Sequence, residues 1–261
     1  MKKLLAMVTI IVVSLTISGC SVKLGMDKRN SNSDKNIEKT VSVEGVKSLM
    51  INTDMSKINV MNYDGDEIKI TAELSDSTKG IDISQVGDKL DISEKTSGAN
   101  FSIFGKSNYN ASDIEISIPK NFKGDITITQ GVGEIIMEGL RAEKLTLKGG
   151  AGEIRGSEIV CNKLKVDAGV GDIKLFLAEK SGDIDINGGV GEINLEIAEV
   201  GGNLEYKGGV GSARIRIPNN APVKFNAKSG LGNCDIKAKT SNESKYVFDL
   251  SVGIGEIKVL N

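Results

Sequence analysis

The seven residues from Gly188 to Asn194 read GGVGEIN, and this pattern decides the fold because it recurs along the chain. Each copy places an apolar residue between two glycines, usually followed by an acid and then another apolar residue. The other copies are QGVGEII from Gln130, GGAGEIR from Gly149, AGVGDIK from Ala168, GGVGSAR from Gly208, SGLGNCD from Ser229 and VGIGEIK from Val252. A nucleotide-binding loop needs its glycines only once. Seven copies therefore indicate an architectural repeat.

The copies return at a nearly constant interval. The first glycine of each Gly-x-Gly lies at residues 131, 150, 169, 189, 209, 230 and 253, so the steps are 19, 19, 20, 20, 21 and 23 residues. A period of this size is typical of a solenoid, in which each repeat packs on its neighbours.

Each copy follows a run with strand-like alternation, such as Ile184-x-Ile186. Continued with period two, this alternation places first the small Gly188 and then Val190 inside. Ile193 lies three positions further on, which a regular strand cannot accommodate, so we expect the chain to bend at Gly191 and the acid. Each unit is then a strand, a glycine corner, a second strand and a polar turn. The sequence predicts an all-β, single-domain β-solenoid, similar to a β-helix, with coils of about 20 residues.

The corner is a sufficient reason for its glycines, because it needs a positive φ or a close approach of backbones. The first glycine of each copy is expected to point outward. The alternative is functional: a strip free of side chains that a glycan or a partner could follow. In that alternative the candidate partner surface includes Gly189, Gly191, Gly209 and Gly211.

Residues 1–19 have the pattern of a lipoprotein signal peptide. Lys2 and Lys3 precede a short apolar stretch, Leu4 to Ile17, which is too short for a comfortable membrane span. ISGC, ending at Cys20, resembles a bacterial lipobox, which implies cleavage before Cys20 and lipidation of its sulfur. The alternative is an uncleaved anchor helix. We expect an exported protein, lipid-anchored to the extracytoplasmic face of the cell membrane.

The rest of the chain divides by composition. Residues 20–40 are polar and poor in hydrophobic residues, which predicts a flexible tether. Residues 41–125 carry irregular strand-like runs, interpreted as degenerate coils or a cap, in one continuous domain with the regular repeats of 126–261. Thr96 to Ser112 is expected to protrude as a loop with Phe101, Phe104 and Tyr109, either a hydrophobic plug or a lid over a ligand.

Composition excludes several function classes. Without the leader the chain has 31 basic and 35 acidic side chains, a net charge of −4 and not the basic footprint of a nucleic-acid-binding protein. Histidine is absent, which excludes His-based triads and His-ligated zinc. Cys161, expected in a turn, and Cys234, expected to face inward, lie several coils apart, so we predict two free thiols. No cofactor is expected.

The acid after each Gly-x-Gly is expected to form a ladder on the outside. The acids are Glu134, Glu153, Asp172 and Glu192; Ser212 and Asn233 interrupt the ladder, which resumes at Glu256. Two places further on stand Arg155, Lys174, Arg214 and Lys258. Carboxylates about 4.8 Å apart repel by roughly 1 kcal/mol in water, and an adjacent basic column offsets that. A calcium ladder is the alternative, but calcium needs six to eight oxygens and one carboxylate per coil offers too few. We expect a solvated charge ladder and no metal site.

The whole layout resembles a known family. A lipoprotein leader, a polar tether and coils with an ISIPKNFKGDITI segment are similar to the bacterial putative-adhesin, or toast-rack, family of β-strand repeat domains. The resemblance covers about Val41 to Asn261 and implies a β-helix-like fold in the cell envelope. It carries over no catalytic residues.

The expected function is that of a non-catalytic, lipid-anchored envelope module acting as an adhesin-like, scaffold or envelope-stress-related binding protein. A glycan-binding or glycan-active β-helix that uses the outer glycine strip is the alternative. The last motif, GIGEIKVLN, runs into Asn261 without residues for a cap. We therefore expect the C-terminal coil, with Glu256 and Lys258, to present an unpaired edge for a second copy or another envelope protein, if it does not stay solvated.

Overall fold

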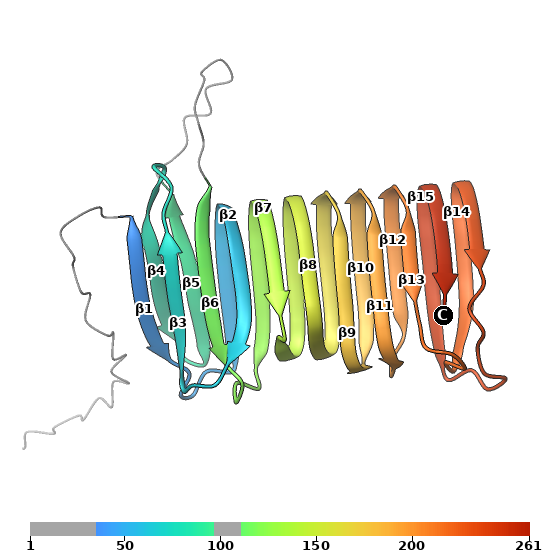
Figure 1. Cartoon of the computed structure of the whole chain (residues 1–261), viewed down its shortest axis with the longest axis horizontal. Helices are drawn as coiled ribbons and strands as arrows, with labels where there is room; N and C mark the ends of the chain where they lie inside the picture. Colours follow the sequence, from blue (N-terminus) through green and yellow to red (C-terminus); the bar gives the residue numbers. More distant parts are fainter. Residues whose placement is uncertain (1–34, 97–110) are drawn as a thin grey trace, which may run out of the picture.

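The computed structural model describes residues 35–96 and 111–261, and these form a single 15-stranded sheet wound into an elongated solenoid (Figure 1). None of the described residues forms a helix long and apolar enough to cross a membrane. The strands are β1 (Asn36–Ser42), β2 (Ser48–Tyr63), β3 (Glu67–Glu73), β4 (Thr78–Val86), β5 (Lys89–Thr96), β6 (Ser112–Pro119), β7 (Asp125–Glu138), β8 (Arg141–Val170), β9 (Ile173–Ser181), β10 (Asp183–Val190), β11 (Ile193–Val200), β12 (Leu204–Val210), β13 (Ala213–Arg216), β14 (Val223–Ile236) and β15 (Tyr246–Leu260).

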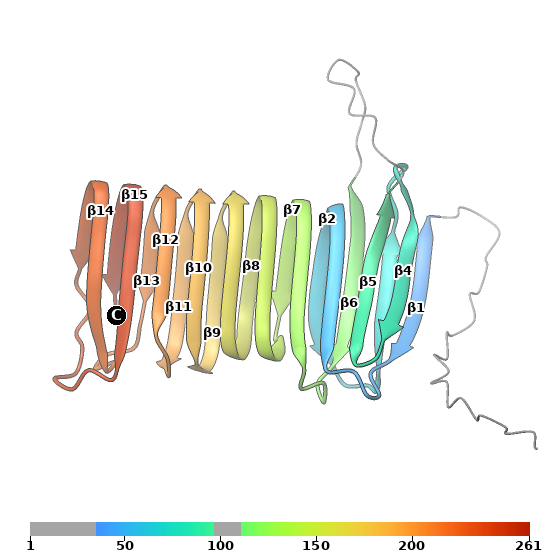
Figure 2. The ribbon, with the colours of Figure 1, turned by 180° about the vertical axis from the view of Figure 1, so that it is seen from behind.

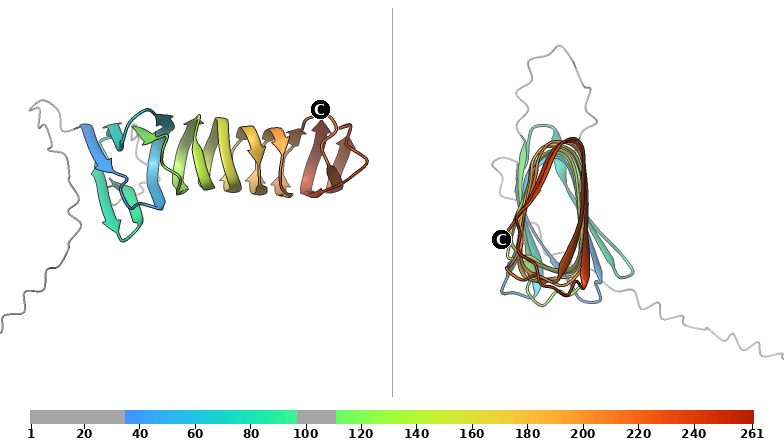
Figure 3. Two further views of the ribbon diagram at one scale, coloured as in Figure 1. Left: turned by 90° about the horizontal axis from the view of Figure 1, so that it is seen from below. Right: turned by 90° about the vertical axis from the view of Figure 1, so that its right-hand side faces the viewer.

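Each regular coil runs up one face of the solenoid, turns at its glycine corner and returns down the other face. Seen along the axis in Figure 3, the coils superpose as a flattened ring. Adjacent coils pair in parallel and in register; Ile184, for example, pairs with Leu164 on one side and Leu204 on the other. The predicted β-solenoid with coils of about 20 residues is confirmed.

The core is a set of apolar columns between the two faces. Alternate residues of each strand point inward, and Ile184, Ile186, Ile193 and Leu195 are at most 4% exposed. Each coil buries its inward residues against those of the coils above and below, because one coil alone has no second layer to cover them. Stacking therefore supplies the core.

The N-terminal part combines a regular coil with an antiparallel end. β2 pairs in parallel with β7 from Ser48 to Met61, so it is the first true coil. Beyond it, β6 on one face and β5 on the other pair in parallel with β2. Antiparallel strands then follow: β3 and β1 next to β6, and β4 in a hairpin with β5 (Figure 2). β1 begins at Asn36, so residues 36–40 belong to the sheet and not to the tether that the sequence predicts. The leader with Cys20, and Phe101, Phe104 and Tyr109, lie outside the described residues.

The C-terminal strand does not end the solenoid. β15 pairs with β12 and β13 on one side and with β14 on the other. After β13 the chain skips the next position in the stack of coils and forms β14 one position further out. It then returns, so that β15 occupies the skipped position between β13 and β14. The expectation of an unpaired edge at Glu256 and Lys258 is therefore wrong, because both residues lie on a strand with neighbours on each side. The terminal coil is β14.

Candidate functional site

The seven glycine corners lie in one line along the edge of the solenoid. In every copy the second glycine has a φ between +133° and +147°, a region that L side chains rarely adopt. A Cβ on Gly191 would lie 2.0 Å from the carbonyl oxygen of Gly171 in the next coil. The predicted bend at the second glycine is confirmed, and its cause is both the backbone conformation and the close approach of the coils.

The first glycine of each corner serves the same close approach. A Cβ on Gly189 would lie 2.0 Å from the carbonyl oxygen of Gly169. The missing side chain would thus meet the backbone of the neighbouring coil, and the expectation that these glycines point outward is wrong. Coil contact accounts for Gly189, Gly191, Gly209 and Gly211 without any ligand.

The residue between the two glycines is on the outside of the corner, although the sequence predicts it inside. Val190 is 49% exposed and Val210 is 45% exposed. Among the described residues eight large hydrophobic side chains are exposed, and six of them occupy this one position of the repeat. We call this row the corner ridge; in spatial order it is Val132, Ala151, Val170, Val190, Val210, Ile254 and Leu231.

Crowding inside the corner explains why this residue lies outside. Ile193, the apolar residue after the acid, folds back beneath the corner, where a Cβ on Gly188 would lie 3.0 Å from its Cδ1 atom. The same relation holds between Gly149 and Ile154 at 3.2 Å. At these corners the isoleucine fills the space inside, so the residue between the glycines cannot also be inside; at Gly208, where the equivalent residue is Ala213, a Cβ would meet the Tyr206 ring instead. The corner ridge was missed because its residues fit the inward alternation.

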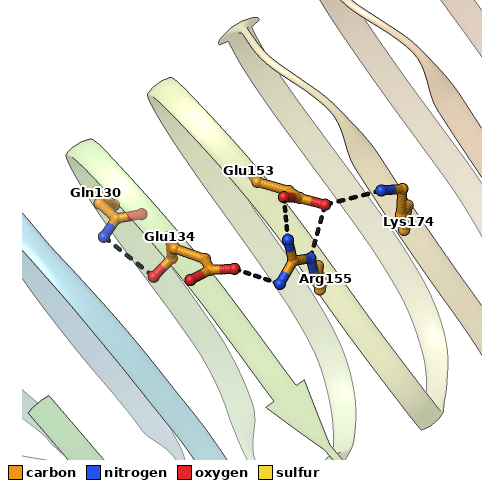
Figure 4. Close-up of polar contacts among 5 residues, drawn as sticks. All are labelled: Gln130, Glu134, Glu153, Arg155 and Lys174. Atoms are coloured by element: carbon orange, nitrogen blue, oxygen red, sulfur yellow. Dashed lines mark hydrogen bonds and ion pairs between the residues drawn. The ribbon is translucent and has the colours of Figure 1, made fainter. Parts of the chain in front are cut away.

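The acids after the corner form the predicted column, and part of it is an ion-pair network that links three adjacent coils (Figure 4). Arg155 pairs with Glu134 of the preceding coil at 2.6 Å and with Glu153 of its own coil, and Lys174 reaches Glu153 at 3.1 Å. The hydrogen bonds from Arg155 are the main cause that lowers the pKa of Glu153; burial opposes them, and the hydrogen bond from Lys174 adds a smaller lowering. The network satisfies the carboxylates with cations of adjacent coils, as expected of a structural charge ladder.

The column differs from its predicted order at one end. Because β15 is inserted before β14, the spatial sequence is Ser212, Glu256 and then Asn233, which lies on the terminal coil. Next to these, Lys258 stacks between Arg214 and Asp235. Within residues 35–96 and 111–261 no group of three or more acids and cysteines has the arrangement of a metal site.

The two cysteines are free and far apart in the fold. Cys161 lies within β8, not in a turn as the sequence predicts, and its side chain is buried. Burial raises the pKa of this thiol to about 12, so it is a poor nucleophile. Cys234 is half-buried on the terminal strand β14, and the predicted pair of free thiols is confirmed.

Two small hollows lie beneath the corners. One is lined by Gly188, Tyr206 and Gly208, and the other by Gln130, Gly149 and Ile154. Each has a volume of about 10 Å³, which is room for one water molecule at most. Neither hollow can hold a ligand larger than water, and the most unusual surface of the described residues is the corner ridge, where six of the eight exposed large hydrophobic side chains lie.

Comparison with known proteins supports the fold. Residues 46–258 match the model of a family described as Toastrack DUF4097. No functionally curated protein matches the chain.

Similar solved structures include three bacterial proteins. A putative cell adhesion protein from Clostridium sporogenes is 18% identical, with 87% of this chain and 98% of that chain covered and a TM-score of 0.42. Putative adhesins from Bacteroides fragilis (15% identity, 87% and 98% covered, TM-score 0.46) and Parabacteroides merdae (13%, 88% and 98%, 0.40) are also similar. The family model spans the whole solenoid from the first coil to the last inserted strand, and this chain belongs to the Toastrack DUF4097 family.

Proposed function

We propose that the protein is a non-catalytic, lipid-anchored, adhesin-like module of the cell envelope that binds a partner protein along its corner ridge. The observation that carries this proposal is the gathering of exposed aliphatic side chains in one row. Six of the eight exposed large hydrophobic residues of the described chain lie there. Exposed hydrophobic residues scattered singly need no explanation, whereas a contiguous row indicates an interaction site.

The fold does not require these side chains to be aliphatic. An extended corner favours β-branched residues, but threonine satisfies that preference as well as valine does. Val170, for example, is 57% exposed and contributes little to the core. The aliphatic character of the ridge is therefore attributed to a bound partner.

The geometry of the ridge favours a protein partner. Seven rungs spaced about 4.8 Å apart extend for about 29 Å, which suits a long groove or an extended segment of another protein. Glycines flank each rung, so a partner can approach the backbone on both sides. Glycan sites commonly use aromatic side chains, and the ridge has only Val, Ala, Ile and Leu. The glycan-binding alternative thus becomes an outcome of the experiment.

In the experiment, purified protein from Ser21 onward is added to cell envelopes of the source bacterium, prepared from a strain in which the gene for this protein is deleted, and the bound protein is measured. The test variant carries Val170→Thr, Val190→Thr and Val210→Thr, which keep side-chain shape and remove apolar surface. The control variant places threonine at Lys148, Lys163 and Glu199, which are exposed positions away from the ridge.

Each buried valine contributes about 1.5–3 kcal/mol, so the ridge variant should bind more than about tenfold more weakly, and the control should bind as the wild type does. Prior protease treatment of the envelopes should abolish binding. Equal binding by the ridge variant would contradict the proposal, and binding that survives protease but not glycan digestion would favour the glycan alternative. Turnover of the bound polymer would contradict a non-catalytic role.

A further inference from the structure

The two ends of the solenoid differ, and the C-terminal end is the more open one. β14 pairs only with β15 among the described strands. Its inward side chains Phe225, Ala227 and Cys234 are half-buried, whereas inward residues of the middle coils are almost fully buried. Phe225 packs edge-on against Phe248 of the preceding coil, with ring centroids 5.8 Å apart.

The backbone of this terminal strand has hydrogen-bonding groups that face away from the sheet. In a parallel pair, alternate residues bond to the same neighbour. The carbonyl of Pro222 accepts from the Tyr246 amide, and the Lys237 amide donates to the Val259 carbonyl. By alternation, the N–H and C=O groups of Phe225, Ala227 and Cys234 point to the open side. Such a row of unpaired groups is a template for another strand.

The open end is also the basic part of the molecule. Residues 218–245, which comprise β14 and its connections, carry five lysines and two acids, a net charge of +3. The described N-terminal part, residues 35–96, carries eight lysines and twelve acids, a net charge of −4. The two ends of the solenoid are thus opposite in charge.

The charges discriminate between two ways of pairing a second copy. In a two-fold contact of β14 with itself, Lys224 and Lys228 would face the lysines of the other copy, and like charges opposite each other destabilise a sheet. A head-to-tail contact would place them against the acidic N-terminal end. That end also has two edge strands, β1 and β4, and the Lys39 side chain of β1 donates a hydrogen bond to the Ile81 carbonyl of β4 at 3.0 Å.

We propose that the open edge of β14 pairs with the acidic N-terminal edge of a second copy, so that the solenoids assemble head to tail. A heterologous contact of this kind leaves the outer ends free and gives open chains instead of closed dimers. It uses the backbone edge of β14 and not the side chains of the corner ridge, which remain exposed along the assembled rod except near Leu231 on β14 itself. The proposal is therefore independent of the proposed function.

The test is analytical ultracentrifugation of the chain from Ser21 onward, over a wide concentration range, at about 0.02 M and about 0.5 M salt, where screening lengths differ severalfold. The expected result is a weight-average mass that rises continuously with concentration at low salt and falls at high salt. A monomer at every concentration would overturn the proposal. So would a dimer that stops at two copies and tightens with salt, since that is the behaviour of a two-fold contact between basic ends.

Two variants locate the contact. Ala227→Pro removes an N–H that faces the open side, where proline is tolerated, and should abolish assembly without lowering the thermal unfolding temperature appreciably. Lys224→Glu with Lys228→Glu reverses the charge of the edge and should also abolish it. The matched control is Lys144→Glu with Lys148→Glu, which hold the same positions relative to the corner motif in a central coil. Assembly that survives both edge variants, or that is lost equally in the control, would refute an edge-to-edge contact.

Discussion

Three glycine-to-alanine substitutions separate the two reasons for a glycine in this fold. Gly139→Ala adds a methyl group at a φ of +61° with nothing within 4 Å, so it tests backbone conformation alone. Gly189→Ala keeps an ordinary φ but places Cβ 2.0 Å from the Gly169 carbonyl oxygen, so it tests coil contact alone. Gly191→Ala combines a φ of +147° with a 2.0 Å approach to the Gly171 oxygen.

The expected losses in the free energy of unfolding follow from these geometries. A left-handed conformation costs an L residue about 1–2 kcal/mol, which sets the loss for Gly139→Ala. Overpacking against a backbone that cannot move freely costs about 1–3 kcal/mol, which sets the loss for Gly189→Ala. Gly191→Ala should lose about the sum, on the order of 4 kcal/mol, because both effects act at one residue. That is a large fraction of the stability of an ordinary domain.

The assay is urea unfolding followed by far-ultraviolet circular dichroism, with midpoints compared only among variants of equal denaturant dependence. The predicted order of stability is wild type, Gly139→Ala, Gly189→Ala and Gly191→Ala. Equal, small losses at Gly189 and Gly191 would show that neighbouring coils are not in contact at the corner, and the reasoning would fail.

Four further predictions follow from individual contacts. Lys258→Pro removes an inter-strand hydrogen bond from a strand that is paired on both sides and should cost about 1–3 kcal/mol, whereas Ala227→Pro on the open edge should cost far less. Thermal unfolding of the two variants measures the contrast, and similar losses would place β15 at an edge. The pKa of Glu153 in the folded state is below the ordinary value of 4.5, so its ion pairs stabilise the protein above that pH and this stability is lost as pH falls through the lowered pKa. Glu153→Gln should therefore make the urea midpoint less sensitive to acid. A pH profile equal to that of the wild type would refute this prediction. Cys234 should react with a thiol reagent in the native protein and Cys161, buried and with a pKa of about 12, only after unfolding; equal rates would contradict the burial of Cys161. Cys20→Ala should leave an unprocessed precursor without acyl labelling in cells, and normal processing of this variant would show that ISGC is not a lipobox.

Much of the fold could be predicted from the sequence because the repeat states it directly. Alternating residues such as Ile184 and Ile186 specify the inward face, and the spacing of the glycines specifies the coil length. The column of Glu134 and Glu153 with the bases beside it also follows from the register, since in-phase repeats place equivalent residues side by side.

Two features could not be predicted in this way. Val190 fits the inward alternation, and its exposure depends on Ile193 filling the space under the corner, which is a packing relation between residues of opposite strands. The position of β15 depends on the order in which equivalent coils stack, and equivalent repeats do not specify that order. The only signal was the spacing of the last corner glycines, 21 and 23 residues, which gives the chain enough length to skip one position in the stack and return to it.

The order of the last coils determines which strand is the open edge and how the last residues of the corner ridge follow one another. It places Ile254 next to Val210 and separates Val210 from Leu231 by one coil. Adjacent rungs are about 4.8 Å apart, within the range for a disulfide, while a separation of two rungs exceeds the limit of about 7 Å.

The most direct measurement is oxidative cross-linking of cysteine pairs in a background with Cys161→Ser and Cys234→Ser. The pair Val210→Cys with Ile254→Cys should form an intramolecular disulfide, detected by mass spectrometry of the digested protein, and the pair Val210→Cys with Leu231→Cys should not. Efficient cross-linking of residues 210 and 231, with none between 210 and 254, would mean that the coils stack in sequence order and would contradict the structure described.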